Sequence, residues 1–226
     1  IKLSIMAPCA VKLPENISLR ERRRLTSLQL HDIMADMMYD TTEKNMPLFN
    51  SLLQAEKIYG GKHKIALDIM KKTLTYSQFL LKTYVLGAAY KKALRDDDKV
   101  GVLLPNSLAC AVSFFALQSA GKIPVMLNFS LGDKQFLSCL QTVALRQVIT
   151  SRRFIEQGKL ERLEQILQRQ NCRIIYLEDF ATQISWLTKL KGLKKYWRRL
   201  PVQTDAAQAA VILFTSGSEG LPKAVL

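Results

Sequence analysis

Residues 100–127 read VGVLLPNSLACAVSFFALQSAGKIPVML, and the first 22 of them carry no charged side chain. A stretch of that length is long enough to cross a bilayer as a helix. Pro105 and Asn106 stand a quarter of the way in, however, and a proline there would break the helix. We therefore expect a buried strand, a helix and a second strand, over 100–104, 107–120 and 123–127. Two strands joined through one helix by short connections indicate a βαβ unit with parallel pairing.

The same alternation extends on both sides of this unit. Helical periodicity covers 48–59, 75–94, 133–144, 154–170 and 179–199, and short apolar segments that fit strands lie at 63–69, 147–150, 173–177 and 210–214. Alternation at this period indicates an α/β fold with a mostly parallel sheet over residues 47–226.

The first 46 residues follow a different pattern. Residues 1–6 alternate apolar and polar side chains, as an edge strand would. Ser18, followed by Glu21, is typical of a capping box, and it predicts a helix that runs to about Tyr39. A polar segment over 41–45 then predicts a linker.

One pair in this helix fits a catalytic pattern. His31 and Asp36 match H-x-x-x-x-D, in which glycerolipid acyltransferases hold a histidine base oriented by an aspartate. The pair lies inside a continuous helical pattern, and Leu30 stands where that family usually has asparagine. We therefore interpret His31 as part of a charged helix face and assign no catalytic residue to this chain.

The composition excludes several classes. The chain has 226 residues with 10 glycines and 7 prolines, which is too few for a collagen-like or low-complexity protein. Its cysteines form no C-x-x-C or C-x-x-H pair, so we expect no zinc or other metal site. Cys110, Cys139 and Cys172 have apolar neighbours, and we expect them to be buried, reduced thiols.

A glycine-rich segment follows the last predicted strand. Residues 214–223 read FTSGSEGLPK and combine three hydroxyls, two glycines and a lysine. Glycines let the backbone approach a ligand closely, and successive amides in such a turn can bind an anion. The spacing fits neither a Walker A loop nor G-x-G-x-x-G. On the residues alone, the segment is either a phosphate-binding turn or an ordinary surface loop.

At these residues the chain resembles a known family. The string LFTSGSEGLPK at 213–223 resembles the phosphate-binding signature of the adenylate-forming enzymes, which include acyl-CoA synthetases, luciferases and peptide-synthetase adenylation domains. The usual form is [YF]-T-S-G-[ST]-[TE]-G-x-P-K-G-V. Residues 100–106 and 120–128 also resemble the early strand-helix-strand of this family. The resemblance implies the incomplete N-terminal part of an adenylate-forming domain.

Within that family, the chain resembles bifunctional bacterial enzymes in which a glycerolipid acyltransferase domain precedes an acyl-[acyl-carrier-protein] synthetase domain. The resemblance rests on short stretches at 22–24, 31–34, 150–154, 158–160, 176–179 and 218–220. It implies that residues 1–43 are the C-terminal tail of the acyltransferase domain plus a linker, and that residues 47–226 are a truncated synthetase domain. Ile1 at the start and the strand-like end at Leu226 lead us to expect a piece of a longer polypeptide, inactive alone.

The resemblance also implies a reaction and its partners. A fatty acid and ATP, with Mg²⁺, give acyl-AMP and pyrophosphate, and the acyl group passes to the phosphopantetheine thiol of acyl carrier protein. It is finally used to reacylate a lysophospholipid, lysophosphatidylethanolamine. This implies a protein of phospholipid metabolism at the cytoplasmic face of the bacterial inner membrane. No signature of nucleic-acid binding is found.

The residues that would hold the ATP phosphates follow from the same resemblance. They are Thr215, Ser216, Gly217, Ser218, Gly220 and Lys223. Ala224 departs from the usual glycine, and its methyl group is tolerable only where φ is negative. The family segments that bind adenine, ribose, metal and the acyl group would lie beyond Leu226.

The segment 186–200 has a strongly two-sided pattern. Its apolar side chains recur at i, i+4, i+7, i+11 and i+14, and basic residues fill the rest. This is typical of a helix at a membrane surface, but it also fits a packed helix with snorkelling lysines, and both interpretations stay open. The candidate membrane contacts are Trp186, Leu190, Leu193, Lys194, Lys195, Trp197, Arg198 and Arg199. The alternative to an enzyme is therefore a non-enzymatic basic module that binds an anionic membrane surface.

Overall fold

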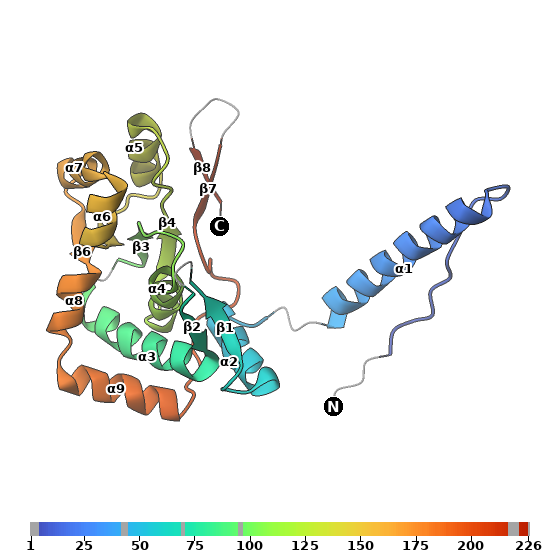
Figure 1. Cartoon of the computed structure of the whole chain (residues 1–226), viewed down its shortest axis with the longest axis horizontal. Helices are drawn as coiled ribbons and strands as arrows, with labels where there is room; N and C mark the ends of the chain where they lie inside the picture. The colour runs from blue at the N-terminus through green and yellow to red at the C-terminus, as the bar shows by residue number, and fades with distance from the viewer. Residues whose placement is uncertain (1–4, 42–44, 69–70, 95–96, 217–221, 226) are drawn as a thin grey trace. The chain divides into compact units, whose positions relative to one another are not determined.

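A computed structural model describes residues 5–41, 45–68, 71–94, 97–216 and 222–225 of the chain. The chain divides into two compact units, residues 1–46 and residues 47–226 (Figure 1). Among the described residues, no helix has both the length and the apolar character that a membrane span requires.

The first unit consists of a single long helix and the segment before it. Helix α1 spans Leu19–Thr41 and begins as predicted, because the Ser18 hydroxyl accepts a hydrogen bond from the Glu21 amide at 3.2 Å. The predicted strand at residues 1–6 lies partly outside the described residues, and Ile5 and Met6 belong to no strand. No described residue of α1 is buried, so this unit has no core of its own.

The histidine of the H-x-x-x-x-D pattern lies well inside α1. His31 and Asp36 are both exposed, and the His31 ring approaches only the neighbouring Asp32 carboxylate, with 3.5 Å between Nδ1 and Oδ1. The pair therefore lies on a solvated helix face, which is how the helical pattern was interpreted.

The second unit is built on a parallel four-stranded sheet. The strands are β3 (Lys99–Val102), β4 (Ile123–Met126), β5 (Gln147–Thr150) and β6 (Arg173–Tyr176), in the order β4-β3-β5-β6. All three neighbouring pairs are parallel. Helix α4 (Leu108–Ser119) joins β3 to β4, and the Ser107 hydroxyl caps its first turn. The predicted α/β fold and its βαβ unit are confirmed.

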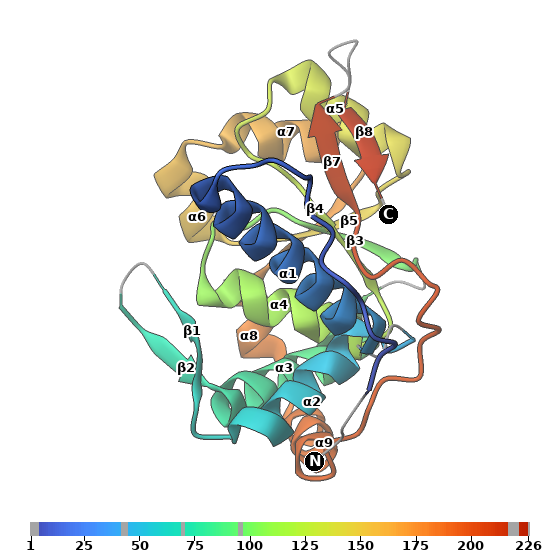
Figure 2. The same cartoon turned by 90° about the vertical axis from the view of Figure 1, so that its right-hand side faces the viewer.

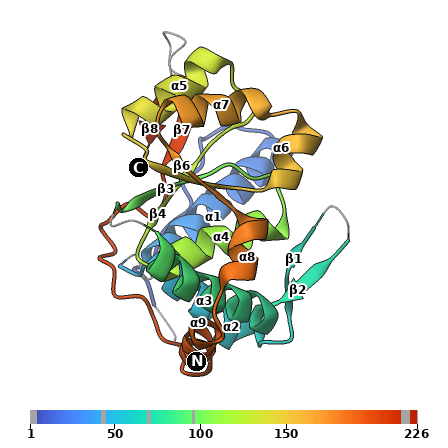
Figure 3. The ribbon, with the colours of Figure 1, turned by 90° about the vertical axis from the view of Figure 1, so that its left-hand side faces the viewer.

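Helices cover both faces of this sheet (Figures 1 and 3). One face carries α3 (Tyr76–Ala93) and α4, and the other carries α5 (Asp133–Thr142), α6 (Arg152–Gly158) and α7 (Glu161–Arg169). Side chains at the end of β3 alternate between the two cores: Val102 packs with the α3 and α4 cluster, whereas Leu103, the residue after β3, packs with the α5 and α7 cluster. Both faces are buried, which explains why most residues of these strands are apolar.

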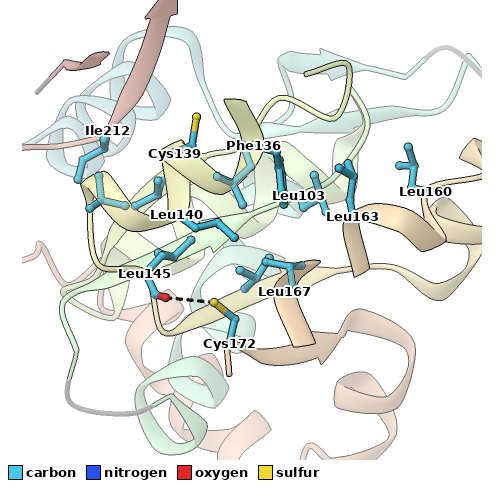
Figure 4. Close-up of a cluster of buried hydrophobic side chains, with 14 of the residues drawn as sticks. Leu103, Phe136, Cys139, Leu140, Leu145, Leu160, Leu163, Leu167, Cys172 and Ile212 are labelled. Atoms are coloured by element: carbon cyan, nitrogen blue, oxygen red, sulfur yellow. Dashed lines mark hydrogen bonds between the residues drawn. The ribbon is translucent and has the colours of Figure 1, made fainter. Parts of the chain in front are cut away.

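The cluster beneath α5 and α7 contains two of the cysteines (Figure 4). Phe136, Leu163 and Leu167 are fully buried there. The Cys172 thiol lies 3.1 Å from the carbonyl oxygen of Leu145, to which it donates. Burial raises the pKa of Cys139 to about 11, with a small opposing effect from its backbone hydrogen bond. The prediction of buried free thiols is confirmed for Cys110, Cys139 and Cys172.

Two predicted helices are each divided in the structure. The helix expected over 154–170 forms α6 and α7, separated at Lys159, whose φ of 51° is left-handed. The helix expected over 179–199 forms α8 (Leu177–Gln183) and α9 (Trp186–Trp197), because the Ser185 side chain caps a new helix. Neither break was predicted from the sequence.

The remaining elements lie beside α3. Helix α2 spans Leu48–Tyr59, as predicted, and buries Phe49, Leu52 and Leu53. Strands β1 (Lys64–Leu67) and β2 (Thr73–Thr75) form an antiparallel hairpin, of which only the first strand was predicted.

Helix α9 packs on α3 through its smallest side chains. Thr188 and Gly192 are the buried residues of α9. A Cβ added at Gly192 would lie 2.5 Å from Val85 Cα and 2.9 Å from the Tyr84 carbonyl oxygen. The two backbones approach each other so closely here that a side chain would have to displace backbone atoms.

We expect Gly192→Ala to lower the free energy of unfolding by about 1–3 kcal/mol, because the methyl group overpacks the contact between α3 and α9. Urea unfolding followed by circular dichroism measures this. Lys191→Ala is the control, since Lys191 is exposed on the same helix and should change stability by less than about 0.5 kcal/mol. Equal stability of the two variants would contradict the close approach.

Candidate functional site

The glycine-rich segment begins at the edge of the parallel sheet. Ile212 lies beside β4, where its amide donates to the Pro124 carbonyl oxygen at 2.9 Å and its own carbonyl oxygen accepts from the Met126 amide at 3.0 Å. The bridge to Val125 is parallel, so the chain runs in the direction of the sheet strands and leaves at their carboxyl ends. In open α/β sheets, ligands bind at that edge.

The chain then forms an antiparallel hairpin of β7 (Leu213–Ser216) and β8 (Pro222–Val225), which lies beside α5 (Figure 2). Phe214 pairs with Ala224, and both pack against the buried cluster beneath α5. The strand predicted over 210–214 is therefore shifted, since β7 begins at Leu213 and ends at Ser216, and Ile212 forms only an isolated bridge. One face of the hairpin is thus anchored to the core, whereas the other faces outward.

The outward face carries a hydroxyl opposite an ammonium group. Thr215 pairs directly with Lys223, and both are exposed. Residues opposite each other in an antiparallel pair have Cβ atoms about 4.5–5.5 Å apart and lie on the same face. A hydroxyl and a lysine so placed are donors suited to phosphate oxygens.

Three of the six predicted phosphate-binding residues therefore share one short hairpin. Thr215 and Lys223 face each other, and Ser216 pairs with Pro222 one position closer to the turn. Gly217, Ser218 and Gly220 lie outside the described residues.

Ala224, which departs from the usual glycine of the signature, lies in the extended backbone of β8. It is absent from the described residues with positive φ, and its half-buried side chain packs against the core. The added methyl group is therefore accommodated by packing, without backbone strain.

At a second place along the carboxyl edge, the protein's own polar groups bind one another. The connections after β3 and β5 lead to opposite faces of the sheet, and a cavity of about 290 Å³ lies between them, lined in part by Pro105, Ser151 and Glu178. The Glu178 carboxylate accepts hydrogen bonds from the Ser151 hydroxyl at 2.6 Å and from the Arg152 amide at 3.1 Å. Burial works to raise the pKa of Glu178, but these bonds outweigh it and hold that pKa below its usual value.

Next to Ser151, the Arg152 side chain makes two further contacts in the same region. Arg152 binds the Asp179 carboxylate with both Nε and Nη2, at 3.2 Å and 2.5 Å, and its guanidinium stacks over the Tyr176 ring at 3.9 Å. The stretches 150–154 and 176–179, which suggested the bifunctional enzymes, thus meet in space. The sequence did not reveal this contact, because the charged partners are 27 residues apart.

The described residues contain no group of three or more histidine, cysteine, aspartate or glutamate side chains arranged to hold a metal ion. The outward face of the hairpin offers a hydroxyl and an ammonium group, whereas Mg²⁺ prefers carboxylate and other oxygen ligands. The described part of the site thus fits the phosphates of ATP and does not itself form a magnesium site.

Comparison with known proteins identifies the family of this chain. The family model described as AMP-binding enzyme matches residues 55–226, and the chain belongs to that family. One relative is 4-coumarate--CoA ligase 2 of Petroselinum crispum, 25% identical over 185 residues, which cover 81% of this chain and 33% of the ligase. Another is the dapdiamide synthesis protein DdaD of Enterobacter agglomerans, 26% identical over 189 residues, which cover 84% of this chain and 27% of that protein.

Solved structures show the same fold. VinN in complex with 3-methylaspartate has a TM-score of 0.61 at 20% identity, over 80% of this chain and 47% of VinN. The N-terminal subdomain of Klebsiella oxytoca NpsA, bound to 3-hydroxybenzoyl-AMSN, has a TM-score of 0.59 at 17% identity, over 80% of this chain and 41% of that subdomain. The chain spans only about a third of the length of the ligase and about a quarter of the length of DdaD.

Proposed function

We propose that the full-length protein activates a carboxylic acid with ATP. The acid's carboxylate oxygen attacks the α-phosphorus, the bond from that phosphorus to the bridging oxygen breaks, and pyrophosphate leaves as acyl-AMP forms. The observation that carries this proposal is the outward pair of Thr215 and Lys223, at the carboxyl edge of a sheet that belongs to the AMP-binding family.

The roles of the chain's own residues follow from the charge that moves. Pyrophosphate gains negative charge as it leaves, so an ammonium group beside its oxygens stabilises the transition state more than the ground state. Lys223 supplies that charge, and the Thr215 hydroxyl donates to a phosphate oxygen and helps hold the chain of phosphates in line for attack. When bound with ATP, Mg²⁺ would supply further charge neutralisation, held by residues outside the described part of the site. The proposed phosphate-binding set is completed by Ser216, Gly217, Ser218 and Gly220.

For the substrate, we propose a fatty acid. The second step would transfer the acyl group from AMP to the phosphopantetheine thiol of acyl carrier protein, and the product would reacylate lysophosphatidylethanolamine. The support is the resemblance to the bifunctional acyltransferase/acyl-[acyl-carrier-protein] synthetases, in which residues 1–43 would be the end of the acyltransferase domain. Similar proteins include 4-hydroxybutyrate--CoA ligase 2 of Metallosphaera sedula, whose name shows that carboxylate-to-thiol ligation occurs among the relatives.

The second candidate function is a basic module that binds an anionic membrane surface without catalysis. One observation favours it: the apolar stripe of α9 faces solvent. ATP–pyrophosphate exchange distinguishes the two candidate functions, because only an adenylating enzyme would incorporate pyrophosphate into ATP.

The test is ATP–pyrophosphate exchange by the full-length protein with three acids: a long-chain fatty acid, 4-coumarate and aspartate. We expect exchange with the fatty acid to exceed exchange with the other two by at least about tenfold, and the acyl group to appear on holo-acyl carrier protein and not on the apo form, which lacks the thiol. Exchange only with another acid would retain adenylation but overturn the fatty-acid assignment. No exchange with any acid would favour the non-catalytic module.

A further inference from the structure

Unlike an ordinary surface helix, α9 directs its apolar side chains toward solvent. A packed amphipathic helix buries its apolar stripe and exposes its charges. Here the buried residues are Thr188 and Gly192, whereas Trp186 and Trp197 are 67% and 72% exposed. Leu187 and Leu190 are also exposed, at 54% and 49%. The stripe therefore has no cover among the described residues of the second unit.

Contacts on the inner side of α9 fix this orientation. Gly192 lies against the backbone of α3, and the Tyr84 hydroxyl donates to the Leu200 carbonyl oxygen at 2.8 Å. Arg199 at the end of α9 forms an ion pair with Glu56 of α2, with 2.6 Å between Nε and Oε2. The helix cannot roll its stripe inward without breaking these contacts.

Basic side chains border the stripe, and no acidic residue lies between Trp186 and Leu200. At about 100° per residue, Lys194 and Arg198 lie along one side of the line from Trp186 through Leu190 to Trp197. Lys189 lies on the other side, and all three basic side chains are exposed. A protein partner that covered the stripe would have to provide carboxylates along both borders.

Two further lysines lie where the last turn of α9 meets the last turn of α3. A cavity of about 410 Å³ is lined in part by Lys91, Lys195 and Leu200, and none of the described residues that line it carries a carboxylate. Burial and the nearby charge of Lys91 both lower the pKa of Lys195. Two ammonium groups that repel each other in this way favour an anion at the mouth of the cavity.

We propose that the outer face of α9 docks the protein onto an anionic phospholipid surface, with the two tryptophans at the level of the headgroups and the bordering lysines and arginine on the lipid phosphates. Tryptophan favours the membrane interface, and each basic residue near an anionic leaflet adds attraction. Figure 1 places α9 and the β7–β8 hairpin at opposite ends of the second unit, so docking leaves the hairpin open. The proposal does not depend on the adenylation chemistry.

Arg199 and Leu193 are not part of this face. The Arg199 guanidinium is held by Glu56, and Leu193 is half-buried. The docking face therefore consists of Trp186, Leu187, Lys189, Leu190, Lys194, Trp197 and Arg198.

The test uses the full-length protein and vesicles of phosphatidylethanolamine with phosphatidylglycerol, against vesicles of phosphatidylcholine alone. We expect co-sedimentation with the anionic vesicles that weakens as salt rises, since screening reduces the attraction. The Trp186→Ala/Trp197→Ala variant should bind at least about tenfold more weakly, whereas Lys194→Gln/Arg198→Gln should lose mainly the preference for anionic lipid.

Ile58→Ala/Leu67→Ala is a matched control, because these side chains are 69% and 68% exposed on other elements. It should bind like the parent protein. Since both tryptophans of this chain lie on α9, the fluorescence difference between the parent and Trp186→Phe/Trp197→Phe reports on this face. That difference should shift to shorter wavelength when anionic vesicles are added.

Three results would overturn the proposal. The first is equal binding of the parent and the double tryptophan variant. The second is shielding of both tryptophans from acrylamide without vesicles, which would mean that another part of the full-length polypeptide covers the stripe. The third is concentration-dependent dimerisation that is lost in the double variant, which would mean that a second copy covers it.

Discussion

We expect Lys223→Ala to lower ATP–pyrophosphate exchange by the full-length protein by at least about tenfold, which corresponds to about 1.4 kcal/mol of transition-state stabilisation. Lys223 is exposed on β8 directly opposite Thr215, so its ammonium group is free to meet an anion outside the hairpin. Removing it leaves the growing charge of pyrophosphate without that partner. The loss should appear in kcat more than in KM, because the interaction strengthens as charge develops.

Two further variants separate charge from structure in this experiment. Lys223→Arg keeps the positive charge and should retain more activity than Lys223→Ala. Lys57→Ala removes an exposed lysine from α2, far along the chain from the hairpin, and should leave exchange unchanged. If Lys223→Ala exchanged pyrophosphate like the parent protein, the hairpin would not be the phosphate site.

Much of the fold could be predicted because each strand is a short apolar run that ends in a turn or a cap. The helices expected over 107–120 and 75–94 begin close to these positions, where Ser107 and Thr75 cap α4 and α3. The divisions at Lys159, where the backbone is left-handed, and at Ser185, which caps a new helix, were not predicted. Local backbone geometry at single residues decides them, and periodicity does not report it.

The orientation of α9 could not be predicted either, for a different reason. A stripe of tryptophan and leucine is usually buried in a protein core. The sequence pattern therefore left both interpretations open, burial against the protein and contact with a membrane. What turns the stripe outward is shape: Gly192 allows α3 and α9 to approach more closely than any larger residue would. Complementarity between two helices cannot be read from the pattern of one.

For the candidate site, the sequence indicates which residues would bind phosphate, and that assignment stays a prediction; how these residues are arranged could not be predicted. The order of hydroxyls, glycines and lysine at 214–223 indicated phosphate chemistry, and the family model matches this part of the chain. That Thr215 and Lys223 face outward follows only from the pairing of β7 with β8 and from the burial of Phe214 and Ala224 on the other side. The contact between Glu56 and Arg199 left no local signal, because the two residues are 143 positions apart.

That pair carries the largest expected effect on stability. The Glu56 side chain is only 9% exposed, and both of its oxygens accept hydrogen bonds from Arg199, at 2.6 Å and 2.7 Å. The hydrogen bonds to Glu56 raise the pKa of Arg199, against the opposing effect of burial. The guanidinium also stacks over the Tyr196 ring at 3.9 Å. The pair therefore ties the end of α9 to α2 through a contact that water hardly reaches.

We expect Arg199→Ala to lower the free energy of unfolding by about 3 kcal/mol, because it leaves the Glu56 carboxylate buried with only a long hydrogen bond from the Ser77 hydroxyl, at 3.5 Å. Arg198→Ala removes the adjacent, exposed arginine and should change stability by less than about 0.5 kcal/mol. Chemical unfolding followed by circular dichroism compares the two. Glu56→Gln/Arg199→Met should recover part of the loss, since no charge is then buried without a partner. Equal stability of the two arginine variants would show that water reaches Glu56 and that the pair contributes no more than a surface ion pair.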